Sequence, residues 1–343
     1  MENEMSLIRM LICLVFLFAV FSTRSASAQD KVRIGVTNPN MVFLNAHIAV
    51  VKGFLKEEGL QGEVIRMNPS VMITAASTGD IDYPLIFGSV VRAAIRGMPL
   101  RITSNFMTGP MHVLVARSEF KSAQDLKGKT IGIDNHGATG EVTGRMIYKH
   151  FGMDLDKDSK VIALGSAAAR LSALKQGLVH GIIVTPPGDV EAETLGFRVI
   201  ARGYDLFSMP QSGMGAHLKK IHSKPNEVKS VIKALVKASR YIRSNRDGAI
   251  AALVDWGRVH PDLAAATYDS TVKAVTQDGA VPDSGMRLVI DQARSELKIS
   301  REILPAEVEL KSPFCSPFFK GEFSPWDSNP SLEKRGRGDF RTE

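Results

Sequence analysis

The stretch that decides the fold reads DLKGKTIGIDNHGATGE and runs from Asp125 to Glu141. Within it, the apolar run Thr130 to Ile133 predicts a short strand, and a polar loop with glycines then opens a helix. Small residues at such a junction let a ligand approach the free N–H groups of the helix. Open α/β sheets bind ligands where their strands end in this way. An ordinary strand-to-helix turn that binds nothing explains the stretch alone equally well.

The same order of strand, polar loop and helix recurs on both sides of this stretch. Strands are predicted at residues 31–37, 62–67, 81–87, 100–106, 111–116, 130–133, 161–164, 181–184, 197–201 and 212–217. Helices are predicted at residues 44–58, 71–77, 90–96, 122–126, up to 151, 167–176, 190–195, 223–245, 248–256, 261–274 and 283–297. Strands and helices that alternate at short spacing favour parallel, doubly wound sheets.

Composition narrows the class of protein. The 343 residues leave room for one large or two medium domains, and 44% hydrophobic and 23% charged residues are typical of a globular protein. The formal net charge is +7, but the basic residues are scattered among acidic ones. Scattered charge favours a solvated surface over a nucleic-acid groove. The two cysteines are Cys13 and Cys315, so thiol catalysis, cysteine-ligated zinc and disulfides are excluded between them.

The two ends of the chain differ from the body between them. Met10 to Phe21 is apolar and too short to span a bilayer, which takes about 20 residues. Ala26-Ser27-Ala28 follows as a small-x-small site, so we expect residues 1–28 to be a cleaved signal peptide and the mature protein to be periplasmic. An uncleaved anchor is the alternative. The tail, residues 311–343, is dense in Pro, Gly and Ser, and we expect little order there.

Five segments together resemble the substrate-binding proteins of ABC importers in the nitrate, sulfonate, taurine and thiamine-pyrimidine-precursor group. They are the opening stretch, AVVKGFLKEEGL (49–60), STGDIDY (77–83), RGMPL (96–100) and ALKQG (173–177). The resemblance covers about residues 31–310. It ends near Leu304 to Val308, where the chain passes into a tail that looks like a truncated or frameshifted end.

The resemblance implies an α/β fold of two Rossmann-like lobes, the type II periplasmic binding fold, with C-terminal helices. The implied division is residues 29–108 for the first part of lobe 1, 109–204 for lobe 2, and 205–310 for the return to lobe 1 with the C-terminal helices. A ligand would lie in the cleft between the lobes.

The implied function is that of a monomeric periplasmic protein that captures a small organic molecule with an anionic or polar head. It would deliver this molecule to the permease of an ABC transporter, with no nucleic-acid partner. One alternative is a binding module that reports to a membrane sensor. Another is an enzyme that resembles the fungal thiamine-pyrimidine synthase, whose cysteine-rich iron site the body cannot supply. We therefore expect no catalytic residues, no metal and no cofactor, and the sequence does not name the ligand.

Six loops at predicted strand ends supply the expected ligand-binding residues. They are Thr37, Asn38, Asn40, Phe87, Gly88, Ser89, Phe106, Thr108, His136, Gly137, Ala138, Thr139, Ser166 and Thr185. The loops contain no Lys, Arg, Asp or Glu, so helix N-termini and hydroxyl groups would hold an anion. Large residues such as Met41 and Phe87 predict soft apolar walls, unless they merely pack the lobes.

Overall fold

The computed structural model of the chain describes residues 30–136 and 139–310. The predicted signal peptide (residues 1–28) and the predicted tail (residues 311–343) lie outside the described residues, as do the predicted site residues Gly137 and Ala138. Within the described ranges, no helix combines the length and apolarity that crossing a membrane requires.

The first part of the chain forms a three-stranded sheet in the order β2-β1-β3. Its strands are β1 (Asp30–Val36), β2 (Leu60–Arg66) and β3 (Tyr83–Pro84), and β1 runs parallel to β3. The segments after these strands are the 3₁₀ turn η1 (Met41–Phe43) and the helices α2 (Leu44–Val51), α3 (Phe54–Glu57), α4 (Pro69–Thr78) and α5 (Phe87–Ile95). The loops that lead from strand to helix therefore lie at the carboxyl edge of this sheet.

Local sequence explains where these helices start and stop. The helix predicted over residues 44–58 is broken, because Gly53 has a φ of 75° and separates α2 from α3. This left-handed conformation interrupts the helical ladder, and glycine adopts it without steric cost. In α4, the Asn68 side chain accepts from the Ser70 N–H, Pro69 takes the first position, and Gly79 ends the helix at a φ of 87°.

Residues 113–202 contain a five-stranded sheet in the order β10-β6-β9-β7-β8. Its strands are β6 (Val113–Ala116), β7 (Thr130–Ile133), β8 (Lys160–Ala163), β9 (Gly181–Val184) and β10 (Arg198–Arg202). β7 is parallel to β8 and β9, whereas β6 is antiparallel to both β9 and β10. The prediction of a wholly parallel sheet is therefore wrong for β6. This strand begins where its neighbours end, with Val113 paired to Val184.

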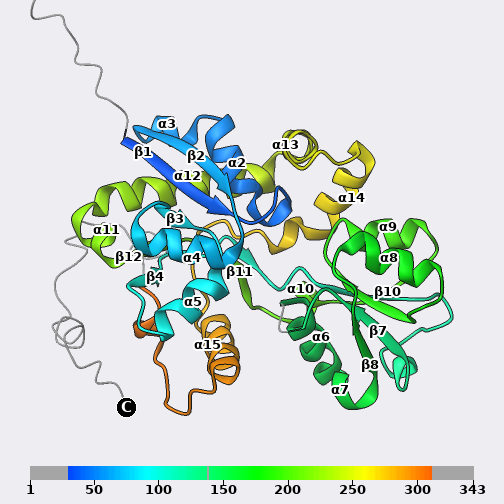
Figure 1. Ribbon diagram of the computed structural model, residues 1–343. Coiled ribbons are helices and arrows are strands. Elements are labelled where there is room, and N and C mark those ends of the chain that lie inside the picture. Colours follow the sequence, from blue (N-terminus) through cyan, green and yellow to red (C-terminus); the bar gives the residue numbers. More distant parts are fainter. Residues whose placement is uncertain (1–29, 137–138, 311–343) are drawn as a thin grey trace, which may run out of the picture. The chain divides into compact units, whose positions relative to one another are not determined.

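Helices cover both faces of the five-stranded sheet (Figure 1). They are η2 (Gln124–Leu126), α6 (Thr139–His150), α7 (Leu155–Asp158), α8 (Ala167–Lys175), α9 (Gly188–Thr194) and α10 (Gly203–Leu206). Ile147 of α6 and Leu155 of α7 pack on one face, in a cluster with Ile131. Leu174 of α8 and Ala192 of α9 pack on the other face. The central strands β6, β7 and β9 are thus buried on both sides, as their apolar runs predict.

Two pairs of short strands carry the chain between the two sheets. β4 (Leu100–Ile102) and β5 (Met107–Thr108) precede the five-stranded sheet, and β11 (Pro210–Ser212) and β12 (Gly215–His217) follow it. β12 pairs antiparallel with β4, and β11 pairs antiparallel with β5. The strand predicted at residues 212–217 is therefore two strands.

The chain then completes the core that its first part began. The remaining elements are α11 (Leu218–Ser223), α12 (Pro225–Ser244), α13 (Arg246–Gly257), α14 (Pro261–Thr271), η3 (Val272–Ala274), α15 (Asp283–Leu297) and η4 (Pro305–Glu307). α12 packs against α2 and α3. Its residues Val231 and Leu235 are fully buried in the same hydrophobic cluster as Val32 and Ile34 of β1. The first core is therefore built from both ends of the described chain.

A buried charge network fastens α11 and α12 to this core. Lys220 of α11 places its Nζ 2.6 Å from Asp82 Oδ1 and 2.7 Å from Glu227 Oε1. Tyr83 donates its hydroxyl proton to Glu227 over 2.8 Å, and the backbone N–H of Arg33 donates to Asp82 over 2.8 Å. Burial and the adjacent Glu227 carboxylate raise the pKa of Tyr83, so its proton stays in the network. Each buried charge here is paired and hydrogen-bonded, which is the condition for burying charge without a large penalty.

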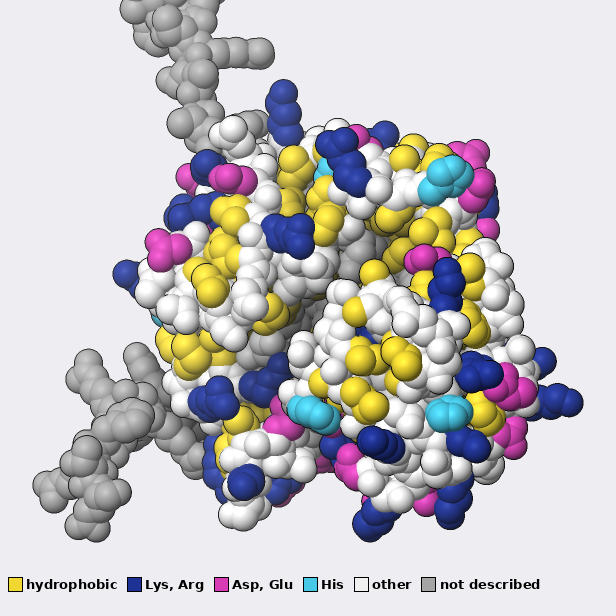
Figure 2. Space-filling model, turned by 45° about the vertical axis from the view of Figure 1, so that its right-hand side comes forward, with side chains coloured by type: hydrophobic (Ala, Val, Ile, Leu, Met, Phe, Trp, Pro, Cys, Tyr) yellow, Lys and Arg dark blue, Asp and Glu magenta, His cyan; other side chains and the backbone are white. Residues whose placement is uncertain are grey.

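Surface charge follows the pattern expected from the sequence. Figure 2 shows Lys and Arg side chains spread over this face with Asp and Glu among them. Exposed ion pairs of the described residues include Lys31 with Glu63 at 2.8 Å and Arg117 with Glu119 at 2.9 Å. On this face the positive charge does not gather into the continuous stripe that a nucleic-acid groove requires.

Candidate functional site

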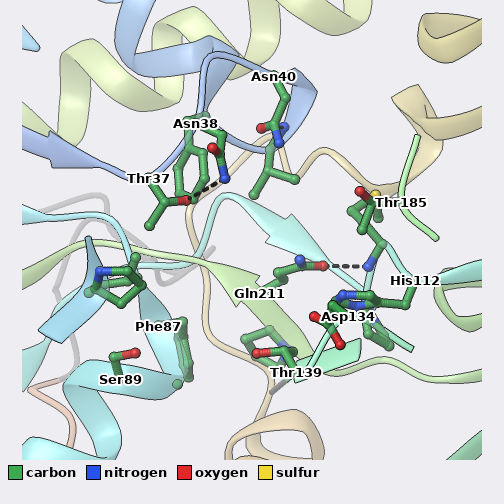
Figure 3. A pocket seen from close by; sticks show the side chains of 18 of the residues that line it. Thr37, Asn38, Asn40, Phe87, Ser89, His112, Asp134, Thr139, Thr185 and Gln211 are labelled. Carbon is green, nitrogen blue, oxygen red and sulfur yellow. Dashed lines mark hydrogen bonds between the residues drawn. The ribbon is translucent and has the colours of Figure 1, made fainter. Parts of the chain in front are cut away.

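A cavity of about 1050 Å³ lies at the ends of the strands of both sheets. One wall comes from the loop after β1, the segment from β2 into α4, and the start of α5. The opposite wall comes from the residues before β6, the ends of β7 and β9, and the starts of α6 and α8. Figure 3 shows Thr37 and Ser89 on one side and His112, Asp134 and Thr185 on the other. The reversed direction of β6 brings Met111 and His112 to this edge.

Most of the described residues that the sequence predicted for a binding site do line this cavity. They are Thr37, Asn38, Asn40, Phe87, Gly88, Ser89, Thr139 and Thr185. Met41, which was expected as an apolar wall, also lines it, and so do Phe43 and Met111. Segments up to 148 residues apart, from Thr37 to Thr185, are thus brought to one space by the topology.

Four predicted residues are not among those that line the cavity. Phe106 is 2% exposed within the first core, and Thr108 lies in β5 and donates its hydroxyl proton to the Ala274 carbonyl over 3.2 Å. Ser166 caps α8 by accepting from the Ala169 N–H. The His136 side chain is 65% exposed and lies 3.0 Å from Glu141. Phe106 and Thr108 precede the segment that reaches the cavity, because the chain turns toward β6 at Pro110 to His112.

Three arginines line the cavity although none of them belongs to the predicted loops. Arg66 ends β2, Arg92 lies in the second turn of α5, and Arg170 lies in the first turn of α8. Helical side chains point back toward the helix N-terminus, so a residue one turn inside the helix covers its first turn. Accordingly, Arg92 donates to Ser89 Oγ over 3.1 Å, and Arg170 donates to the Gly165 carbonyl. The cavity lining therefore contains charged side chains that the predicted loops do not.

The first wall carries positive charge and several hydrogen-bond donors. α5 begins here with no side chain capping its N-terminus, so the N–H groups of its first turn, which includes Gly88 and Ser89, have no side-chain acceptor at the cap. Arg66 donates to the Thr37 carbonyl over 3.2 Å, and Arg92 lies 3.4 Å from Glu296 on α15. An uncapped helix start beside two guanidinium groups favours an anionic ligand group.

The second wall is built where the chain leaves β7 and enters α6. Asp134 follows β7, and its carboxylate lies where a side chain at Gly140 would be, 2.6 Å from that Cβ position. Gly140 therefore lets Asp134 approach the first turn of α6, where a negative charge stabilises the helix. The group that approaches the backbone at Gly140 is thus the Asp134 carboxylate and not a ligand, although Asp134 also lines the cavity. Arg170 completes this wall.

His112 is the histidine that faces the cavity, and the sequence reasoning missed it inside a predicted strand. It is 8% exposed, and its Nδ1 lies 3.4 Å from Thr143 Oγ1. Thr143 donates its own proton to the Thr139 carbonyl over 2.9 Å, which leaves its oxygen free to accept from the ring. Burial lowers the pKa of His112 to about 4, with Asp134 opposing and Arg170 reinforcing the shift. The ring is therefore neutral at pH 7.

This neutral histidine predicts a loss of stability in acid. Because its folded pKa is below the unfolded value, the unfolded chain binds the proton first as pH falls from about 6.5 to about 4. His112 should then reduce the free energy of unfolding by on the order of 2–3 kcal/mol across this window. Urea unfolding at pH 7 and pH 4.5 measures it, with His112→Gln as the control that should lose less. Equal losses in both proteins would show that His112 is not buried neutral.

The comparisons with known proteins agree with this geometry. The family model described as NMT1/THI5 like matches residues 39–249, more than half of the chain. The chain belongs to the NMT1/THI5-like family. A curated binding protein of Brucella abortus (strain 2308) is 26% identical over 208 residues, which are 59% of this chain and 64% of that protein. The chain thus spans less than two thirds of the length of this relative.

Solved structures establish the fold of this NMT1/THI5-like chain. The periplasmic aliphatic sulphonate binding protein SsuA of Escherichia coli superposes with a TM-score of 0.68 at 18% identity, covering 88% of this chain and 99% of that one. The alkanesulfonate-binding protein SsuA of Xanthomonas axonopodis pv. citri, bound to MOPS, gives a TM-score of 0.64 at 17% identity over 84% and 100% of the two chains. The predicted fold class, that of the periplasmic binding proteins, is confirmed.

The same fold also carries chemistry elsewhere. The desulfurization enzyme DSZB superposes with a TM-score of 0.63 at 14% identity, over 89% of this chain and 99% of that one. Within the described residues of this chain, no three His, Cys, Asp or Glu side chains gather as a metal site would require. The fold alone does not distinguish a binding protein from an enzyme, so the functional assignment rests on the residues of the cavity.

Proposed function

We propose that this protein is the solute-binding component of an ABC importer and captures a small organic anion in the cavity. The observation that carries this proposal is the excess of positive charge in the lining. Among the described lining residues, the charged ones are Arg66, Arg92, Arg170 and Asp134. Together with the uncapped start of α5, this arrangement favours a negatively charged ligand.

The rest of the lining suits the body of an organic molecule. Phe87, Met111 and Met209 are buried apolar residues that meet the cavity. Apolar walls with a few fixed polar groups are typical of small-molecule sites. Bare nitrate or sulfate would leave most of the 1050 Å³ unfilled. The proposed role agrees with that of the two proteins of this fold described above, which are named as sulfonate-binding proteins.

The proposal includes export and a lobed organisation. The signal peptide at residues 1–28 would place the mature protein in the periplasm, where a permease partner would receive the ligand. The boundaries at residues 108, 204 and 310 remain predictions. Both walls of the cavity would have to touch the ligand, because a ligand held by one wall gives no reason for closure.

A matched set of small probes tests the proposed ligand class. We expect benzenesulfonate to raise the melting temperature of the purified protein by a few degrees, and benzenesulfonamide and benzylamine to have less effect at equal concentration and ionic strength. Mass spectrometry of the denatured protein identifies any ligand that co-purifies. A larger stabilisation by the neutral or cationic probe, a co-purified cation, or turnover of the bound molecule would contradict the proposal.

A further inference from the structure

The second wall of the cavity holds two opposite charges that do not neutralise each other by contact. Asp134 and Arg170 both line the cavity. Arg170 is only 6% exposed. Burial lowers the pKa of its guanidinium group, and the negative charge of Asp134 opposes this shift. Within the described residues, neither Asp134 nor Arg170 has an oppositely charged group within 4.0 Å. The two groups are thus near enough to feel each other and too far apart to bond.

Both side chains also have enclosed atoms without a hydrogen-bond partner. Asp134 Oδ1 and Arg170 Nε are buried and unpaired. Buried polar atoms in proteins are almost always satisfied, and an unpaired buried charge is costly. Arginine–carboxylate pairs in proteins frequently close into a direct bidentate contact. These two remain apart beside an open space.

The charge balance of this wall differs from that of the first wall. One carboxylate and one guanidinium group cancel, and His112 between α6 and β6 is neutral at pH 7. A ligand carboxylate here would be attracted by Arg170 and repelled by Asp134, and an ammonium group would meet the reverse. A neutral group with a donor and an acceptor side by side satisfies both residues at once, because its N–H bonds the carboxylate and its C=O bonds the guanidinium group.

We propose that Asp134 and Arg170 form a second subsite that selects ligands whose far end, opposite the anionic group, is a neutral donor–acceptor group such as a primary carboxamide. This subsite rests on the proposed function, since it assumes that the anionic end lies at Ser89 and Arg92. It makes Asp134 and Arg170 specificity-determining residues of the cavity. The ligand is then an organic monoanion with a polar neutral end rather than a dianion or a zwitterion.

Three para-substituted benzoates separate these possibilities on one carbon skeleton. Terephthalamate ends in a carboxamide, terephthalate in a second carboxylate and 4-(aminomethyl)benzoate in an ammonium group. We expect isothermal titration calorimetry on the full chain at pH 7 to show terephthalamate binding about tenfold more tightly than either of the other two. A preference for terephthalate or for 4-(aminomethyl)benzoate, or no binding of terephthalamate, overturns the subsite.

Two charge variants test whether Asp134 binds the N–H and Arg170 the C=O of the carboxamide. Asp134→Asn removes the negative charge and should shift the preference at least tenfold toward terephthalate. Arg170→Gln should shift it at least tenfold toward 4-(aminomethyl)benzoate. Lys175→Gln is the matched control, because Lys175 is an exposed residue of the same helix and should leave the order of the three probes unchanged. Unchanged preferences in folded Asp134→Asn and Arg170→Gln proteins would refute the assignment, and the probe order of the parent protein decides if a variant does not fold.

Failure of the subsite can be told apart from failure of the proposed function. If benzenesulfonate stabilises the protein but terephthalamate is not preferred, the anion-binding function stands and the subsite falls. If no organic anion of either set binds, the proposed function falls and the subsite falls with it.

Discussion

The Lys220→Met protein is expected to lose about 3 kcal/mol of its free energy of unfolding, because two buried carboxylates lose the ammonium group that they share and keep only the more exposed Arg33 and Lys224 as counter-charges. The Lys220 ammonium group is bonded to both Asp82 and Glu227, and the side chains of these two acids are only 9% and 5% exposed. Methionine fills a similar volume and removes the charge. Urea unfolding at pH 7 measures the loss as a shift of the midpoint at constant slope.

A matched lysine on the surface isolates the effect of burial. Lys233 of α12 lies 2.7 Å from Glu58, but its side chain is 69% exposed. Lys233→Met should therefore cost at most about 1 kcal/mol. Adding Asp82→Asn and Glu227→Gln to Lys220→Met should restore part of the lost stability, because it removes the two buried negative charges that have lost their shared partner. Equal losses of unfolding free energy in Lys220→Met and Lys233→Met would show that the buried network stabilises the protein no more than a surface ion pair.

A bulky side chain in either wall of the cavity should weaken the binding of benzenesulfonate about ten- to a hundredfold. Ser89→Trp would cover the uncapped start of α5, and Thr185→Trp would fill the space at the end of β9 on the opposite wall. A lost charge-assisted hydrogen bond is worth roughly 1.5–3 kcal/mol, which corresponds to that change in affinity. Calorimetric titration measures both variants at one salt concentration.

The control for these two variants adds the same bulk elsewhere. Leu178 is 66% exposed and is not among the lining residues, so Leu178→Trp should bind benzenesulfonate like the parent. Small-angle scattering should show compaction of the parent with the ligand and less in Ser89→Trp and Thr185→Trp. If only one of the two walls matters, capture between both walls is wrong.

The sequence predicted most reliably the elements whose pattern is local. β7, β9 and α15 have the predicted bounds, because turn residues and a regular apolar period mark both of their ends. β3 is shorter than the predicted strand at residues 81–87, because Phe87 already begins α5. The direction of β6 could not be read, since its apolar run fits a parallel or an antiparallel neighbour equally well.

The candidate site was predictable where backbone ends define it and unpredictable where long side chains do. Ser89 and Thr185 follow strands, so the carboxyl-edge rule finds them. Arg92 and Arg170 lie one turn inside helices and reach back, which requires knowing where each helix begins. His112 depends on the reversal of β6, and the approach of Asp134 to Gly140 depends on the fold of the loop between them.

The two short strand pairs also set the order in which the protein can be built. All strands of the five-stranded sheet are contained in residues 113–202, so this sheet can form as soon as that segment has been synthesised. The strands of the β2-β1-β3 sheet also lie within one segment, residues 30–84, but the core around them is completed only when β12 and α12 have been synthesised, at residues 215–244. The earliest part of the chain is thus among the last to reach its native contacts. Such distant packing slows folding, because the entropy of closing a long loop has to be overcome before the contacts form.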